Sequence, residues 1–119
     1  MRIGLFTGGG DCGGLEAVIR GVVFAADNEN IEVIGIPNGY LGLYNLDKNP
    51  GIKIPCSMVD NRAKKCGTVL GTSRVKLHSI PDGFEKVKKN LQNEGIEILV
   101  GAGGDDTSLV LEQLSNSGF

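Results

Sequence analysis

The residues with the clearest chemical meaning in this sequence lie in two glycine-rich turns that also carry aspartate. The first turn contains Gly8-Gly9-Gly10-Asp11, and the second contains Gly103-Gly104-Asp105-Asp106. Glycine lets the main chain approach a ligand closely. A helix that starts at such a turn offers N–H groups and the positive end of its dipole to an anion. The pattern therefore predicts that both turns bind phosphate groups.

An aspartate beside a phosphate needs a compensating positive charge. Asp105 and Asp106 would repel a phosphate unless a cation lay between them. Mg²⁺ typically takes one or two protein carboxylates and fills its other positions with waters and phosphate oxygens. Arg74, which ends a loop of small residues, carries forked donors that suit phosphate. Each feature alone has a simpler explanation: the Gly-Gly-Asp sequence could be only a turn with a helix N-cap, and Arg74 could be an ordinary surface arginine.

Strands and helices must position these turns, and the apolar pattern predicts both. We expect strands over Arg2–Thr7, Ile31–Ile36 and Ile96–Val100. We expect helices over Leu15–Asn28, from a capping box at Ser79 and Asp82 through Glu94, and from about Thr107 to Ser115. Segment 37–53 should be irregular or carry one short helical turn. Strand-helix-strand succession favours right-handed crossovers, so the predicted fold class is α/β, a three-layer Rossmann-like parallel sheet in one domain, 1–119.

Composition excludes several classes of protein. The chain has 119 residues, 40% of them hydrophobic, and a net charge of −2, so neither disorder nor nucleic-acid binding is expected. No apolar run reaches the roughly 18 residues that a membrane span needs. Three cysteines at long spacings and one histidine disfavour a disulfide scaffold and a zinc site. We expect a cytoplasmic protein with no membrane partner.

The first turn also fits a dinucleotide-binding fingerprint. Gly8, Gly10 and Gly13 satisfy Gly-x-Gly-x-x-Gly. That fingerprint calls for an acidic residue at the end of the second strand, where this chain reads Ile36-Pro37-Asn38. A dinucleotide-binding Rossmann module is therefore a minor alternative.

Four segments resemble the N-terminal part of 6-phosphofructokinases, in the same order along the chain. They are Arg2–Arg20, Ile36–Tyr44, Cys66–Arg74 and Gly103–Asp106. The resemblance covers about the first third of a family member and implies an incomplete phosphofructokinase N-terminal domain. It implies phosphoryl transfer from ATP or pyrophosphate to the 1-hydroxyl of fructose 6-phosphate, a step of glycolysis, with Mg²⁺ in a cytoplasmic homo-oligomer.

The resemblance also assigns residues. It implies that Gly9 and Arg74 bind the donor phosphates, that Gly104 and Thr107 flank them, and that Asp105 holds the magnesium ion. ATP-dependent members generally carry glycine where this chain has Asp106, so Asp106 predicts pyrophosphate as donor. The resemblance assigns no catalytic base in this chain, and the 119 residues alone are expected to be inactive. The alternative is a truncated, non-catalytic phosphofructokinase remnant.

Overall fold

The computed structural model describes residues 1–8, 14–59, 70–71 and 80–119, which are built on a four-stranded sheet. Its strands are β1 (Arg2–Thr7), β2 (Glu32–Gly35), β3 (Ile52–Lys53) and β4 (Ile98–Ala102), in the spatial order β3-β2-β1-β4. β1 pairs in parallel with β2 and with β4, whereas β3 runs antiparallel to β2. The three parallel strands therefore end at one edge of the sheet.

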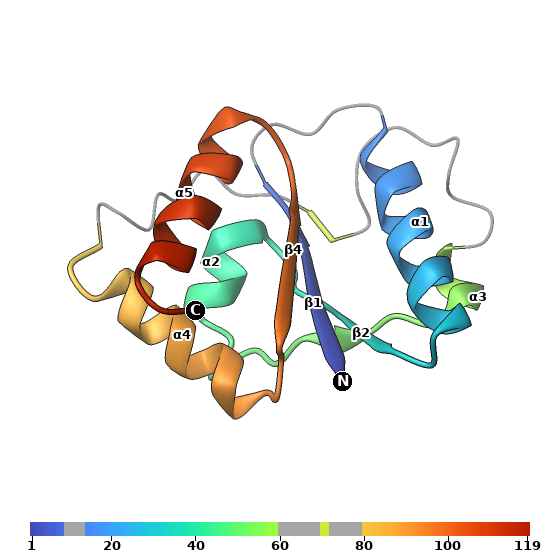
Figure 1. Ribbon diagram of the computed structural model, residues 1–119, viewed down its shortest axis with the longest axis horizontal. Coiled ribbons are helices and arrows are strands. Elements are labelled where there is room, and N and C mark those ends of the chain that lie inside the picture. Colours follow the sequence, from blue (N-terminus) through green and yellow to red (C-terminus); the bar gives the residue numbers. More distant parts are fainter. Residues whose placement is uncertain (9–13, 60–69, 72–79) are drawn as a thin grey trace.

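Helices cover both faces of the sheet. They are α1 (Leu15–Asn28), α2 (Gly39–Tyr44), α3 (Cys56–Val59), α4 (Gly83–Asn93) and α5 (Asp105–Asn116). Figure 1 shows α1 and α3 on one side of the strands, and α2, α4 and α5 on the other. No helix in the described part of the chain is long and apolar enough to cross a membrane.

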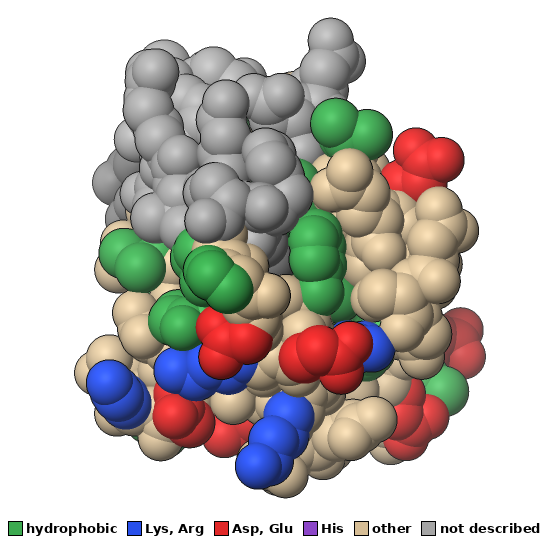
Figure 2. Space-filling model, turned by 90° about the vertical axis from the view of Figure 1, so that its left-hand side faces the viewer, with side chains coloured by type: hydrophobic (Ala, Val, Ile, Leu, Met, Phe, Trp, Pro, Cys, Tyr) green, Lys and Arg blue, Asp and Glu red, His purple; other side chains and the backbone are tan. Residues whose placement is uncertain are grey.

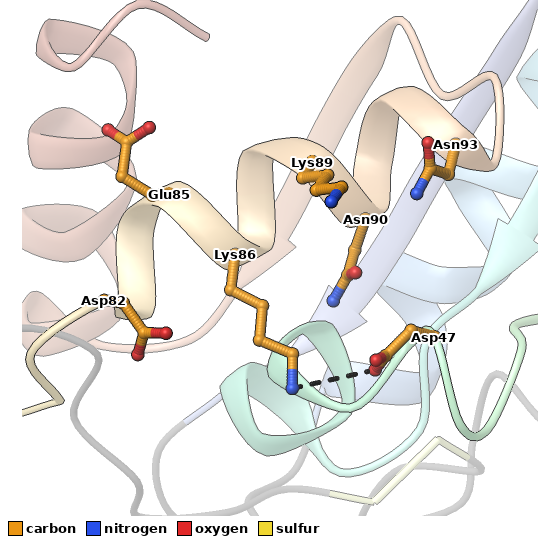
Figure 3. A pocket seen from close by; sticks show the side chains of 7 residues that line it. All are labelled: Asp47, Asp82, Glu85, Lys86, Lys89, Asn90 and Asn93. Carbon is orange, nitrogen blue, oxygen red and sulfur yellow. Dashed lines mark ion pairs between the residues drawn. The ribbon is translucent and has the colours of Figure 1, made fainter.

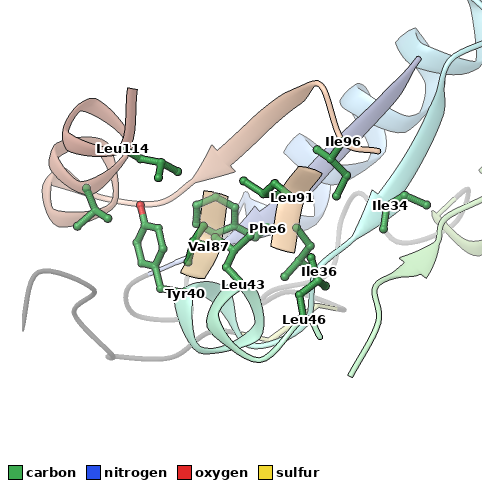
Figure 4. Packing of buried hydrophobic residues seen from close by; sticks show 11 residues of the cluster. Phe6, Ile34, Ile36, Tyr40, Leu43, Leu46, Val87, Leu91, Ile96 and Leu114 are labelled. Atoms are coloured by element: carbon green, nitrogen blue, oxygen red, sulfur yellow. The ribbon is translucent and has the colours of Figure 1, made fainter. Parts of the chain in front are cut away.

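Two apolar clusters fill the spaces between these layers. The larger one lies between the sheet and the helices α2, α4 and α5 (Figure 4), and its buried members include Phe6, Tyr40, Val87, Leu91 and Leu114. The smaller one lies under α1 and includes Leu5, Ile19, Val23 and Val33. Leu5 and Phe6 are neighbours on β1 that point to opposite faces, which is why one strand contributes to both clusters.

The predicted three-layer α/β class is confirmed, and the strand β1 and the helix α1 have the predicted bounds. The sheet is mixed because the two-residue strand β3 lies in the segment that was expected to be irregular. Ile52 and Lys53 are both exposed and too short a run to show strand alternation. The short helical turn expected in that segment is present as α2.

The predicted boundaries around the second glycine turn are wrong by two residues. The strand β4 continues through Gly101 and Ala102, and α5 begins at Asp105 instead of Thr107. Gly101 belongs to the strand because it packs on an aromatic ring. A Cβ atom added there would lie 2.6 Å from the ring of Phe6. The glycine thus marks a close approach inside the sheet, and the turn itself is only Gly103 and Gly104.

The helix expected to start from a capping box at Ser79 begins later. α4 starts at Gly83, and its N-cap residue is Asp82, while Ser79 lies outside the described residues. The physical reason is Pro81, since the residue before a proline is disfavoured in helical conformation. Ile80 therefore cannot readily form the first helical position that the capping box requires.

Candidate functional site

The two glycine turns begin side by side at the carboxyl edge of the sheet. Thr7 and Ala102, the last residues of β1 and β4, are register partners. Beyond them the main-chain N–H of Gly8 donates a hydrogen bond of 2.8 Å to the carbonyl oxygen of Ala102. In Figure 1 this edge lies at the top, where α5 also begins. Ligands of parallel α/β sheets bind at this edge, so both predicted phosphate-binding turns start where a ligand would bind.

Thr107 packs between the two turns. It lies in the first turn of α5 and is 2% exposed. A Cβ atom added to Gly8, or to Gly103, would come within 2.5 Å of the Thr107 Oγ1 atom. Both glycines are therefore required by the packing of this threonine. The resemblance places Thr107 beside the donor phosphates, and its buried side chain packs against Gly8 and Gly103, the first residues of the two turns.

Gly104 has a different environment. It is the exposed N-cap residue of α5, in extended conformation, and its carbonyl accepts a 3.2 Å hydrogen bond from the N–H of Ser108. A Cβ atom added there would meet no described atom within 4 Å. The first N–H groups of an α-helix have no acceptor within the helix. Among the described residues, the space beside Gly104 is therefore free at a helix N-terminus, which is the kind of place where anions bind.

A third segment reaches the same edge. The hydroxyl of Thr7 donates a 2.8 Å hydrogen bond to the carbonyl of Gly71, and the N–H of Asn38 donates one of 2.8 Å to the carbonyl of Leu70. Gly71 has a φ angle of 71°, which favours glycine. These bonds hold residues 70–71, which precede Arg74 in sequence, against the ends of β1 and β2.

The structure describes the predicted site only in part. Gly104 and Thr107 lie at the carboxyl edge, and Asp105 and Asp106 form the start of α5, although their side chains are outside the described part of the chain. Gly9 and Arg74 also lie outside the described residues.

Sequence reasoning missed Tyr40. Its hydroxyl donates a buried 2.6 Å hydrogen bond to the main-chain carbonyl of Thr107. The ring is 5% exposed and lies 4.8 Å from the ring of Phe6, centroid to centroid. Burial raises the pKa of the Tyr40 hydroxyl above its usual range, so the group stays a neutral donor. The available signal was a tyrosine between Gly39 and Gly42, but its partner is 67 residues away in sequence.

The residues at this edge suit a magnesium ion. Mg²⁺ prefers oxygen ligands and needs only one or two protein carboxylates when phosphate oxygens complete its shell. Asp105 is the first residue of α5 and follows Gly104, near which an added Cβ atom would meet no described atom. A carboxylate at that position would supply the hard oxygen ligand, and the helix N-terminus would face the accompanying phosphate.

An open pocket of about 590 Å³ lies elsewhere, along α4 (Figure 3). It is lined by Asp47, Asp82, Glu85, Lys86, Lys89, Asn90 and Asn93. The Nζ atom of Lys86 is 3.8 Å from a carboxylate oxygen of Asp47 and 4.1 Å from the ring centre of Tyr44. Figure 2 shows Lys or Arg side chains together with Asp or Glu side chains on the lower part of the face that it presents. The pocket therefore offers no concentrated charge to a phosphate.

A three-layer α/β fold with two glycine turns at the carboxyl ends of neighbouring parallel strands defines a class of phosphate- and nucleotide-binding proteins. Comparison with known families is more specific, because the sequence pattern of phosphofructokinase matches residues 2–118. The chain belongs to the phosphofructokinase family.

Relatives with different phosphoryl donors are similar to this chain. An ATP-dependent 6-phosphofructokinase of Serratia proteamaculans is 42% identical over 118 residues, which are 99% of this chain and 36% of that protein. A pyrophosphate–fructose 6-phosphate 1-phosphotransferase of Dictyoglomus thermophilum is 37% identical over 119 residues, 100% of this chain and 34% of that protein. The chain thus spans about a third of the length of these relatives.

Solved structures agree on the fold. The T-state phosphofructokinase of Pichia pastoris matches with a TM-score of 0.90 at 27% identity, over 98% of this chain and 12% of that one. The pyrophosphate-dependent phosphofructokinase of Marinobacter aquaeolei matches with a TM-score of 0.74 at 19% identity, over 98% of this chain and 30% of that one. The second likeness concerns the fold alone.

Proposed function

We propose that this chain forms the donor-phosphate and magnesium part of a site that transfers a phosphoryl group from pyrophosphate or ATP to fructose 6-phosphate. The observation that carries the proposal is that both glycine turns start at the same edge of the sheet, where Gly8 donates a hydrogen bond to Ala102, in a chain of the phosphofructokinase family. Phosphoryl transfer depends mainly on positioning and on charge stabilisation. Helix N–H groups, a carboxylate and an arginine supply these.

The N-terminus of α5 would bind the donor. The first N–H groups of a helix have no acceptor within it, and together with the helix dipole they favour a phosphate. Among the described residues, nothing blocks the approach at Gly104. Thr107 would hold this turn against Gly8, where the first turn begins, because its buried side chain packs against Gly8 and Gly103. The donor would therefore meet main-chain groups whose spacing is set before it binds.

Asp105, through a bound magnesium ion, and Arg74 would offset the negative charge of the donor phosphates. Bound Mg²⁺ would neutralise charge that develops on the transferred phosphoryl group, and Asp105 would hold this ion. Arg74 would bind donor phosphate oxygens with its forked donors. Gly9 would contribute its main chain to the same phosphates.

Binding to the chain as it stands tests the proposal directly. In ¹H–¹⁵N NMR spectra of the 119-residue chain, pyrophosphate with Mg²⁺ should shift the amide signals of Gly104 and Thr107. The signals of Gln92 and Asn93, at the far end of α4, serve as internal controls. Unchanged signals at Gly104 and Thr107 up to millimolar pyrophosphate would contradict the proposal.

Activity tests the role of Asp105 in a full-length protein, by which we mean a complete phosphofructokinase that carries this chain as its N-terminal part. Asp105→Asn should lower kcat by orders of magnitude and leave the fold intact, since it removes the charge that holds the ion. Glu112→Gln, an equivalent change at an exposed position of the same helix, is the matched control. Near-normal kinetics for Asp105→Asn would show that the aspartate belongs only to the turn.

A further inference from the structure

Tyr40 connects the larger apolar cluster to the start of α5. Its ring packs in that cluster beside Phe6, with an angle of 55° between the two ring planes. Its hydroxyl leaves the cluster and donates to the carbonyl of Thr107 at 2.6 Å. Figure 4 shows the hydroxyl directed toward α5. The main chain of the first turn of α5 is therefore attached to α2, 67 residues away in sequence.

This bond differs from ordinary packing because it restrains a main-chain group. A buried hydroxyl must find an acceptor or lose the free energy of its hydration. Burial raises the pKa of the Tyr40 hydroxyl, so the group remains a neutral donor at neutral pH. The acceptor belongs to the same turn that carries Gly104 and Asp105. A donor fixed at Thr107 therefore limits how far the N–H groups of this turn can tilt.

We propose that Tyr40 is a positioning residue for the phosphoryl donor, and that its hydroxyl holds the N-terminus of α5 at the angle at which its N–H groups meet the donor phosphates. The inference rests on the proposed function of the α5 turn. Tyr40 acts through the main chain of Thr107 and needs no contact with the donor. Loss of the hydroxyl should then affect the donor more than the phosphoryl acceptor.

Tyr40→Phe in the full-length protein removes the hydroxyl and keeps the ring that packs on Phe6. We expect the KM for the better donor, pyrophosphate or MgATP, to rise about fivefold, with the KM for fructose 6-phosphate unchanged. Ile36→Val is the matched control, because it removes one buried methylene from the same cluster and no polar group. Equal changes of both KM values, or no change beyond that of Ile36→Val, would overturn the inference.

Hydrogen exchange gives a second measurement, which needs no catalysis. In Tyr40→Phe the amide of Ser108, which bonds to the carbonyl of Gly104 at 3.2 Å, should exchange several times faster than in the unmodified chain. Unchanged exchange there would show that the hydroxyl does not restrain the turn. If the unmodified protein binds neither donor, the proposed function fails. If it binds one and Tyr40→Phe behaves like Ile36→Val, only the role of Tyr40 fails.

Discussion

The side chain of Thr107 occupies the space that a side chain at Gly8 would need. These residues are separated by nearly the whole chain, yet an added Cβ at Gly8 would lie 2.5 Å from the threonine Oγ1. Real Cβ atoms do not approach other atoms so closely, and the contact involves a buried group with little freedom to move. Gly8, where the first turn begins, is thus coupled to the second turn by packing on Thr107 as well as to β4 by its hydrogen bond to Ala102.

Gly8→Ala should therefore destabilise the fold. Overpacking of this kind costs about 1–3 kcal/mol, which urea denaturation of the chain would measure. Gly21→Ala is the matched control, because Gly21 is exposed within α1 and an added Cβ meets no described atom within 4 Å. That control should gain about 0.5–1 kcal/mol from helix propensity. A Gly8→Ala variant as stable as the unmodified chain would show that Thr107 can move aside.

Gly104→Ala, unlike Gly8→Ala, should leave stability unchanged and weaken the use of the phosphoryl donor. Gly104 has ordinary extended dihedral angles and no described atom within 4 Å of an added Cβ, so the fold should tolerate alanine. The added methyl group would enter the space through which a donor phosphate approaches. In the full-length protein we expect an unchanged Tm and a donor KM raised at least threefold. An unchanged donor KM would indicate that the donor does not approach Gly104.

The sequence predicted the elements with a strong local pattern and missed those that depend on distant partners. β1 and α1 were predicted correctly because apolar spacing and a glycine turn define them locally. The end of β4 was misplaced because Gly101 has the composition of a turn but packs on Phe6. By contrast, the common starting edge of the two turns could be predicted, because it follows from parallel pairing of the strands. The bond between Tyr40 and Thr107 could not, because it has no signature in sequence.

Asn90 illustrates another such long-range contact, with a measurable cost. Its side-chain amide donates hydrogen bonds of 2.9 and 3.1 Å to the carbonyl oxygens of Leu43 and Tyr44. These bonds attach the C-terminal end of α2 to α4. Asn90→Leu would leave these carbonyls without that donor, and we expect a loss of about 2 kcal/mol in the free energy of unfolding. Asn93→Leu, the same change at an exposed position of α4, should cost less than about 0.5 kcal/mol. Equal losses for the two variants would contradict this role.

Tyr40 should also give stability a dependence on alkaline pH. Its pKa is raised above the ordinary value of 10 in the folded chain, so the folded state retains a proton that the unfolded state releases. The contribution of Tyr40 to the free energy of unfolding is fully present below about pH 10 and is lost as the pH rises above that value. Urea denaturation between about pH 9 and 11 should show a steeper loss for the unmodified chain than for Tyr40→Phe. Ile36→Val should keep the steeper slope, and identical slopes for all three would exclude the effect.

Asp106 should decide the choice of phosphoryl donor in the full-length protein. The helix α5 begins at Asp105 with Gly104 as its N-cap, so Asp106 does not cap a helix that starts at Thr107. Asp106 is the second residue of α5, so its carboxylate would add negative charge at the helix end that we propose to receive phosphate. Like charges about 4 Å apart repel by about 4 kcal/mol at an effective dielectric constant near 20, before screening by salt. The longer polyphosphate chain of ATP would meet this charge, whereas pyrophosphate is shorter.

We therefore expect pyrophosphate to have the higher kcat/KM in the parent protein, and Asp106→Gly to raise kcat/KM for ATP at least tenfold. Glycine removes both the charge and the bulk of the side chain. Glu112→Gln, which removes a charge near the other end of α5, should leave the ratio of the two donors unchanged. The measurement is a side-by-side comparison of initial rates with each donor at saturating fructose 6-phosphate. If the parent already uses ATP as well as pyrophosphate, and Asp106→Gly changes neither rate, the carboxylate has no part in donor choice.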